Sequence, residues 1–182
     1  MNNNIIEFYK KVMDLKTINR SGWEDVGITD VESIMDHIGG TIMFAMAINA
    51  EKELNLDMSK VYEMIAISEI RKLNKESVEE VLNILSNNAR LLEVYNEYKE
   101  GISREANFAS MVLRLESDMQ AKRYEKDGVF TLENALKDIE NYPEDVKANL
   151  TNVTKASEGW MEYNRKYYDD MFKELSSDIQ EI

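Results

Sequence analysis

His37 is the only histidine of the chain, and no cysteine is present. These counts exclude a zinc site with two or more histidines, Cys-ligated metals, disulfides and thiol nucleophiles. They leave at most one Ser-His-Asp arrangement. A lone histidine in an amphipathic helix is most often a core or boundary residue with satisfied hydrogen bonds, and less often a metal ligand. What His37 can do therefore depends on the donors that the fold brings to it.

The elements that must position His37 are predicted to be helices throughout. One proline, Pro143, and seven glycines interrupt a chain rich in strong helix formers, and no segment has the pattern of a strand. The predicted fold is therefore all-α, in a single domain. Helices are expected over residues 5–15, from the capping pair Thr29 and Glu32, over 57–73, over 76–99 with a break near 86–88, over 103–126, from Thr131, from Pro143, and over 157–179.

The charge of the chain limits its partners. A formal net charge of -13 repels nucleic-acid backbones and anionic lipid surfaces, so neither nucleic acid nor membrane is expected as a partner. A small anionic ligand stays compatible, because one pocket can carry a positive field against the overall sign. Residues 1–7 lack the pattern of a signal peptide and no stretch has the length of a membrane span, so a cytoplasmic location is expected.

Five segments carry motifs in a consistent order: Leu-Lys-Thr-Ile-Asn-Arg-Ser-Gly-Trp at 15–23, Val-Glu-Ser-Ile-Met-Asp-His at 31–37, an apolar stretch at 61–70, and the segments 112–121 and 159–168. Together they resemble the HD-domain metal phosphohydrolases, in particular the branch that includes bacterial 5'-deoxynucleotidases. The resemblance covers residues 15 to about 175. It implies an HD-type helical bundle with a five-helix core over about residues 3–127 and a C-terminal helical extension over about 129–182.

The resemblance also implies a metal site whose ligands are largely replaced. In the family, two histidines and two aspartates hold a divalent cation, and its bound water becomes the hydroxide that attacks the phosphate. His37 matches the first ligand, and Ser68 stands in place of the second histidine. Glu69 replaces the next aspartate and Leu113 the final one, and the four positions are expected to converge in space. Serine is a poor ligand and leucine none, so no bound metal is expected; if manganese, cobalt, iron or zinc does bind, His37 and Glu69 hold it.

Two further carboxylates could help to rebuild such a site. Asp36 is next to His37 but points in another direction, because neighbouring residues on a helix do not share a face. Glu116 is one helical turn beyond Leu113 and is the better candidate. It also matches an ordinary Leu-Glu pair of the family, so a structural role stays open for it.

Basic residues lie at or beside positions where the family has acids. Lys72 replaces an acidic residue one turn after the His-Asp pair, and Arg114 follows the lost aspartate position. These cations either take over the charge of the metal, by pairing with Glu69 or binding phosphate, or are surface residues of a drifted pocket. By the resemblance, Arg20 and Trp23 line the nucleotide pocket. The alternative is a loop that Trp23 anchors by packing, with Arg20 in a salt bridge.

We predict a degenerate HD-domain protein that lacks the usual metal-dependent hydrolysis and keeps a small phosphate- or nucleotide-type pocket formed by Arg20, Trp23, Lys72 and Arg114. One alternative is an active, 5'-deoxynucleotidase-like phosphohydrolase with an atypical metal site. The other is a non-catalytic helical interaction module. Aromatic residues at helical spacing near the end predict a stripe that faces the core or a second copy, and a homodimer is expected. They are Trp160, Tyr163, Tyr167, Tyr168 and Phe172.

Overall fold

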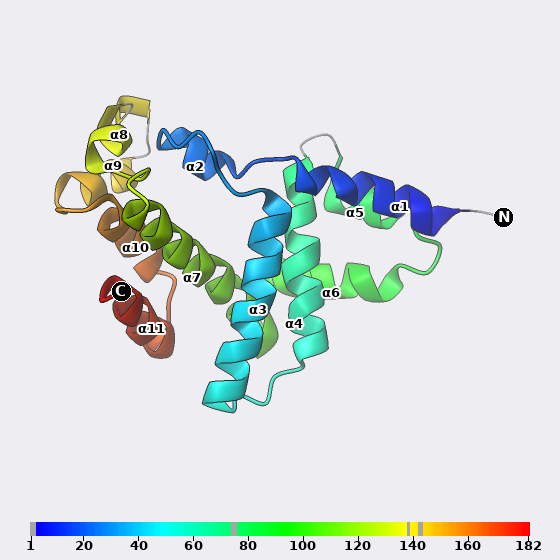
Figure 1. Ribbon diagram of the computed structural model, residues 1–182. Coiled ribbons are helices and arrows are strands. Elements are labelled where there is room, and N and C mark those ends of the chain that lie inside the picture. Colours follow the sequence, from blue (N-terminus) through cyan, green and yellow to red (C-terminus); the bar gives the residue numbers. More distant parts are fainter. Residues whose placement is uncertain (1–2, 74–75, 138, 142–143) are drawn as a thin grey trace. The chain divides into compact units, whose positions relative to one another are not determined.

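The computed structural model describes residues 3–73, 76–137, 139–141 and 144–182, and their regular structure is helical (Figure 1). Extended strands are absent from this part of the chain, in which an isolated β-bridge joins Asn19 to Ser33. The predicted all-α fold is therefore confirmed. The α-helices are α1 (Asn4–Met13), α2 (Ser21–Asp25), α3 (Ile34–Lys52), α4 (Met58–Ser68), α5 (Val78–Leu82), α6 (Ala89–Glu100), α7 (Arg104–Lys126), α8 (Leu132–Lys137), α9 (Glu144–Thr151), α10 (Ala156–Arg165) and α11 (Asp170–Gln180). The 3-10 helices are η1 (Asp14–Lys16), η2 (Glu69–Leu73) and η3 (Ile139–Asn141).

The chain divides into two compact units. The first unit comprises Met1–Asn19 and Glu32–Leu113, and the second comprises Arg20–Val31 and Arg114–Ile182. The boundary lies within α7, whereas the sequence predicted a core that ends near residue 127. The expected organisation as a single domain stays a prediction. No helix among the described residues is long and apolar enough to cross a membrane.

The helix that carries His37 begins at a different capping box from the predicted one. The Ser33 hydroxyl accepts a hydrogen bond from the Asp36 backbone N–H at 3.1 Å. The Asp36 carboxylate in turn accepts from the Ser33 N–H at 3.0 Å and from the Ser33 hydroxyl at 2.7 Å. The prediction of Thr29 and Glu32 as the capping pair was wrong, because a cap must lie directly before the first helical turn and that turn begins at Ile34.

Other predicted helix ends agree more closely with the structure. The Asp57 side chain caps α4 by accepting from the Lys60 N–H, as expected. Helix α4 ends at Ser68, earlier than predicted, because the chain tightens there into η2. Gly101 ends α6 with a φ of +64°, a backbone conformation that glycine adopts without Cβ strain.

The C-terminal tail forms two helices where the sequence predicted one over residues 157–179. Helix α10 ends at Arg165, and the Asp169 carboxylate caps α11 by accepting from the Phe172 N–H at 2.9 Å. The helical spacing of the aromatic residues continues across this break, which is why the pattern did not reveal it. The predicted helix start at Pro143 lies outside the described residues.

Helix α4 is the central element of the first unit. It packs against α3, α6 and η2, and Val61, Met64 and Ile65 on it have no exposed surface. Complete burial of such side chains stabilises the unit by about 1.5–3 kcal/mol each. The apolar run around Met64 predicted this central position correctly.

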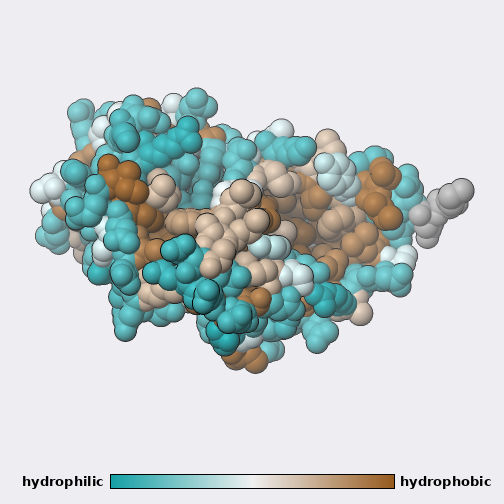
Figure 2. Space-filling model, turned by 60° about the horizontal axis from the view of Figure 1, so that its bottom comes forward, coloured by the Kyte–Doolittle hydropathy of each residue, from teal (hydrophilic) through white to brown (hydrophobic). Residues whose placement is uncertain are grey.

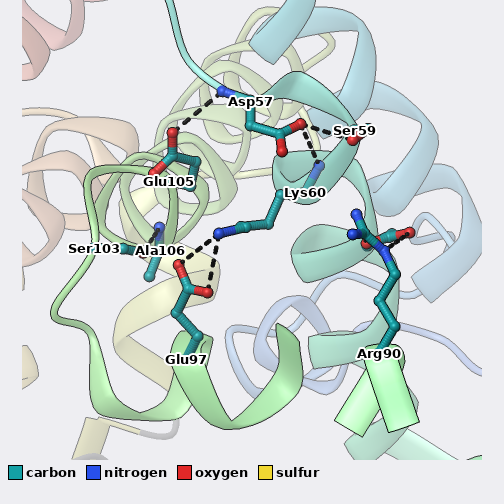
Figure 3. Close-up of polar contacts among 9 residues, drawn as sticks. Asp57, Ser59, Lys60, Arg90, Glu97, Ser103, Glu105 and Ala106 are labelled. Atoms are coloured by element: carbon teal, nitrogen blue, oxygen red, sulfur yellow. Dashed lines mark hydrogen bonds and ion pairs between the residues drawn. The ribbon is translucent and has the colours of Figure 1, made fainter. Parts of the chain in front are cut away.

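Polar contacts fix the N-terminal end of α4 to α6 and to the start of α7 (Figure 3). The Lys60 ammonium group, on α4, lies 3.1 and 3.3 Å from the two carboxylate oxygens of Glu97, on α6. The backbone N–H of Asp57 donates to the Glu105 carboxylate, on α7, at 3.1 Å. Because the Lys60–Glu97 pair is only partly exposed, it orients α4 more firmly than a fully solvated pair would.

The second unit is built around an aromatic core. Trp23, on α2, stacks on Trp160, on α10, with ring centroids 4.2 Å apart. The rings of Tyr124 and Phe130 approach Trp23 edge-on at 5.4 and 5.9 Å. Edge-to-face and stacked contacts of this kind stabilise a core by about 0.5–1.5 kcal/mol each beyond the apolar burial. Trp23 therefore fixes α2 to the C-terminal helices of its unit.

Some large apolar side chains stay exposed among hydrophilic ones, as the face in Figure 2 illustrates. On α3, Met43 and Met46 expose 65% and 46% of their surface, and on α1 Ile5 exposes 75%. Such side chains are common singly and mark an interface only when they form a large patch. The expected homodimer therefore stays a prediction.

A buried carboxylate joins α7 to the tail of the second unit. The Asp118 carboxylate, on α7, accepts hydrogen bonds from Asn164 Nδ2 at 2.7 Å, from the Tyr168 hydroxyl at 2.8 Å and from the Ser176 hydroxyl at 3.1 Å. Burial raises the pKa of Asp118 to about 7, although the three donors oppose this shift. Burial also raises the pKa of Tyr168, and the charge of Asp118 raises it further, so the phenol stays protonated as a donor.

We expect Gly159→Ala to destabilise the protein, because α9 and α10 approach too closely for a Cβ at this position. An added Cβ would lie 2.9 Å from Leu150 Cδ2 and 3.4 Å from the Asn149 carbonyl oxygen. Overpacking should cost about 1–3 kcal/mol. Gly39→Ala is the matched control, since a Cβ there meets nothing within 4 Å and should stabilise α3 by about 0.5–1 kcal/mol. Urea denaturation measures both; equal effects would contradict the close approach.

The free energy of unfolding should fall as the pH rises from about 4 to about 7. The folded protein keeps the proton of Asp118 up to about pH 7, whereas an unfolded aspartic acid loses it near its ordinary pKa of 3.8. The folded state therefore binds more protons than the unfolded state across this pH window. The stability that this proton contributes is lost as the pH rises towards the pKa of folded Asp118. One such group changes stability by roughly 4 kcal/mol at 1.36 kcal/mol per pKa unit. Denaturation of Asp118→Asn at pH 5 and pH 8 should show a flatter profile than the parent; an unchanged slope would refute this.

Candidate active site

His37 lies in the first turns of α3, behind the capping box of Ser33 and Asp36. It is buried, and its backbone N–H donates to the Ser33 carbonyl at 3.2 Å. The capping role of the Asp36 carboxylate makes it unsuited to completing a metal site. The carboxylate of Glu32, in contrast, lies within 4.8 Å of an imidazole nitrogen of His37. This pair was not predicted from the sequence, and a carboxylate just before a helix that carries a lone histidine is the signal that could have found it.

Thr41 lies one turn beyond His37 on α3, on the same side of the helix. Its side chain is fully buried, and its hydroxyl has no hydrogen-bond partner among the described residues. A buried hydroxyl without a partner costs about 1–3 kcal/mol. The face of α3 that carries His37 is therefore polar beyond the imidazole.

Ser68 and Glu69 lie where α4 tightens into η2, and both are buried. The Ser68 hydroxyl donates to the Ile65 carbonyl at 3.0 Å. The Glu69 carboxylate accepts from Arg71 Nη2 at 2.9 Å, and Arg71 Nε donates to the Ser68 carbonyl at 3.1 Å. One guanidinium group therefore neutralises Glu69 and satisfies a carbonyl at the end of α4.

The sequence suggested Lys72, and not Arg71, as a partner for Glu69. Lys72 lies partly buried in η2. The signal for Arg71 is a basic side chain just past a helix end, where it can reach back to the last carbonyls. Burial works to lower the pKa of Arg71, but the charge and hydrogen bond of Glu69 outweigh it, so the pKa rises above its ordinary value. Arg71 therefore remains a cation next to Glu69.

Leu113, at the fourth family position, is buried in the part of α7 that belongs to the first unit. Its side chain offers no lone pair to a metal. The elements that carry His37, Ser68 and Glu69 pack together, since α3 contacts both α4 and η2. The predicted convergence of all four positions stays a prediction.

In the second unit, Arg20 lies between Trp23 and a buried carboxylate. Arg20 Nη1 is 3.8 Å from Glu116 Oε2, and the guanidinium carbon is 5.5 Å from the centroid of the Trp23 ring. Burial raises the pKa of Glu116 to about 7, and the charge of Arg20 opposes this rise. The indole of Trp23 is completely buried, and its role as a ligand-contacting ring stays a prediction. The alternative, a loop anchored by Trp23 with Arg20 in a salt bridge, describes these contacts.

Arg114 lies two residues before Glu116 on α7 and faces other partners. Its Nη1 donates to Asn164 Oδ1 at 3.4 Å, and its guanidinium carbon lies 3.6 Å from the centroid of the Tyr167 ring. Residues two apart point to nearly opposite sides of a helix with 3.6 residues per turn. Arg20 and Arg114 therefore have different partners on α7, and the predicted pocket that they form together stays a prediction.

The residues present do not fit a cation held in the family's arrangement. Of its four positions, Ser68 uses its hydroxyl proton on a backbone carbonyl, Glu69 is paired with Arg71, and Leu113 has no donor. In the first unit, His37 and the nearby Glu32 are the donors whose chemistry suits a divalent ion.

Comparison with known proteins gives the same family by sequence. No family model matches the chain. The chain is 27% identical over 161 residues to the 5'-deoxynucleotidase HDDC2 of Dictyostelium discoideum, which covers 74% of this chain and 84% of that protein. It is 26% identical over 140 residues to the 5'-deoxynucleotidase HDDC2 of Homo sapiens, covering 66% and 68%.

Solved structures show the same fold. A Pyrococcus horikoshii protein superimposes with a TM-score of 0.60 over 94% of this chain and 98% of its own, at 20% identity. A conserved hypothetical protein of Pyrococcus furiosus gives a TM-score of 0.58 over 81% of this chain and 99% of its own, also at 20% identity. With these relatives, the motifs and the all-α fold point to one assignment. The sequence relatives support the predicted resemblance to the 5'-deoxynucleotidase-like branch of the HD-domain superfamily.

Proposed function

We propose that this HD-domain protein binds a small phosphate-bearing ligand without the metal-dependent hydrolysis of its family, and that an arginine–glutamate ion pair has taken the place of the metal centre. The contact of Arg71 with Glu69 at 2.9 Å carries the proposal. Glu69 stands where the family has an aspartate ligand, and Arg71 supplies the positive charge that a metal would otherwise bring there.

Energetics favour the ion pair over a cation at this position. The Glu69 side chain is only 4% exposed, and removing the partner of a buried charge costs about 3–5 kcal/mol in well-buried pairs. Arg71 is 58% exposed, so solvent reduces that cost here. A cation would still have to displace the guanidinium, and neither Ser68 nor Leu113 would offer it a strong ligand in return.

The same guanidinium group can hold a phosphate. An arginine has five N–H donors, and Arg71 uses its Nε and one Nη2 donor on Ser68 and Glu69. Its other donors can meet solvent or ligand, because more than half of the side chain is exposed. Lys72 follows directly in η2, so two cations lie at the end of α4 in a chain whose net charge is -13. Arginine donors suit the geometry of phosphate oxygens.

An active phosphohydrolase is the second candidate, and the proximity of Glu32 and His37 favours it. A carboxylate and an imidazole are suitable ligands for manganese, cobalt, iron or zinc, and a third donor would make a catalytic site. Glu116, one turn beyond Leu113 on α7, is the carboxylate nearest to the lost ligand position on that helix. When bound, the metal would supply a hydroxide for attack on phosphate.

Protein purified without a histidine tag should contain no stoichiometric divalent metal, by elemental analysis, before or after incubation with manganese or cobalt and desalting. It should also not hydrolyse deoxynucleoside monophosphates, because the family ligand set is missing. His37→Ala and Glu32→Gln serve as controls. Bound metal that both substitutions remove, together with turnover on the order of 1 per second that they abolish, would establish the phosphohydrolase instead.

Arg71→Gln should destabilise the protein more than Arg90→Gln. The two arginines are equally exposed, at 58%, but the carboxylate that Arg71 neutralises is 4% exposed, whereas Glu63, the partner of Arg90, is 30% exposed. We expect a cost of about 1–3 kcal/mol for Arg71→Gln and a much smaller cost for Arg90→Gln, whose ion pair is screened by solvent. Chemical denaturation gives both values. Equal small losses would show that Arg71 does not compensate a buried charge.

A further inference from the structure

A cluster of cations and tyrosines lies where α7 meets the end of α10, in the second unit. The Arg114 guanidinium carbon is 3.6 Å from the centroid of the Tyr167 ring. The Lys166 ammonium nitrogen lies 4.2 Å from the Tyr163 ring centroid and 5.2 Å from that of Tyr167. The two tyrosine rings meet edge-on at 6.2 Å. Two positive charges therefore share one aromatic surface.

A buried relay holds Arg114 in place. Asp118 accepts a hydrogen bond from Asn164 Nδ2 at 2.7 Å, which orients the amide so that Asn164 Oδ1 accepts from Arg114 Nη1 at 3.4 Å. Asp118 and Asn164 are both buried, so neither is easily reoriented by solvent. Tyr167 supports the guanidinium from its ring side. The arginine is thereby restricted before any ligand arrives, which lowers the entropic cost of binding.

In the described part of the chain Arg114 has no carboxylate in direct contact, although its charge acts to lower the pKa of the buried Asp118. Among the described residues, its contacts are the Asn164 amide and the Tyr167 ring, and no carboxylate oxygen lies within 4.0 Å of it. The bonds that Asp118 accepts come from neutral donors. In a chain with 35 acidic and 22 basic residues, Arg114 is thus held directly by an amide and an aromatic ring.

We propose that Arg114 and Lys166 form a binding site for the phosphate group of a small ligand, with Arg114 as the anchor and Lys166 as a second cation. This is a second site, separate from the Arg71 guanidinium, and it rests on the proposed function only for the class of ligand. The remaining guanidinium donors of Arg114 bind phosphate oxygens, and Lys166 adds a point charge. Tyr167, which is 44% exposed, leaves an aromatic edge beside the site for an apolar part of the ligand.

Calorimetric titration tests the site with three probes: inorganic pyrophosphate, deoxyadenosine 5'-monophosphate and ribose 5-phosphate. Arg114→Gln should weaken binding by about tenfold or more, since it removes charge-assisted bonds. Arg123→Gln is the matched control, because Arg123 lies on the same helix, carries the same charge and is 75% exposed in a 3.8 Å pair with Asp127. Binding should weaken with added salt. Pyrophosphate alone isolates the phosphate contacts, and tighter binding of the nucleotide than of ribose 5-phosphate would show that a base adds contacts.

Asn164→Leu tests the relay, because it keeps Arg114 but removes the amide that holds it. It should weaken binding less than Arg114→Gln does, with unfolding curves showing that both variants are folded. Binding that Arg71→Gln abolishes but Arg114→Gln leaves unchanged would overturn this site while the proposed function stands. An equal effect of Arg123→Gln would reduce the site to general charge and overturn it too. No binding of any probe by the parent would overturn both.

Discussion

Three carboxylates are buried in the described part of this chain, those of Glu69, Glu116 and Asp118, and the way in which each is compensated decides what the protein can do. A carboxylate out of water needs a counter-charge, hydrogen-bond donors or a proton. Glu69 has the guanidinium of Arg71, and Asp118 has three neutral donors. Glu116 has Arg20 at the longer distance of 3.8 Å and a pKa raised to about 7. The three carboxylates therefore differ in how much of their negative charge is uncompensated and could attract another cation.

Glu69 connects this constraint to the chemistry of the family. A metal site needs ligands whose charge is available, and the Arg71 contact uses that of Glu69. At two other family positions, Ser68 and Leu113 provide no strong ligand that could replace the charge of Glu69. The pair of Glu32 and His37 is the feature of the first unit that keeps metal chemistry open. Similarity to nucleotidases does not by itself assign their activity, since function depends on the site and not on the helices that frame it.

The second unit uses the same two residue types, arginine and aromatic, in two different ways. Trp23 has no exposed surface, so the guanidinium of Arg20 lies against a ring that belongs to the core. Tyr167 is partly exposed, and Arg114 lies on it without an acidic partner among the described residues. A buried aromatic ring mainly stabilises the core, whereas an exposed ring that positions a cation leaves that cation available to a ligand. The two arginines therefore differ in the exposure of the ring that each contacts. The sequence around Arg20 and Arg114 does not reveal this exposure.

By itself, the sequence determined the all-α fold, the caps at Asp57 and Gly101 and the resemblance to the HD-domain family, because helix propensity and capping are local and the motifs keep their order. It also predicted that Ser68 and Leu113 stand in place of two metal ligands, since residue identity alone decides whether a donor exists. Only the tertiary structure decided that Arg71 pairs with Glu69 and that Trp23 is buried. These facts depend on where α4 tightens into a 3-10 helix and on which rings pack against α2. Such contacts join side chains whose directions follow from packing and burial, which local sequence patterns do not encode.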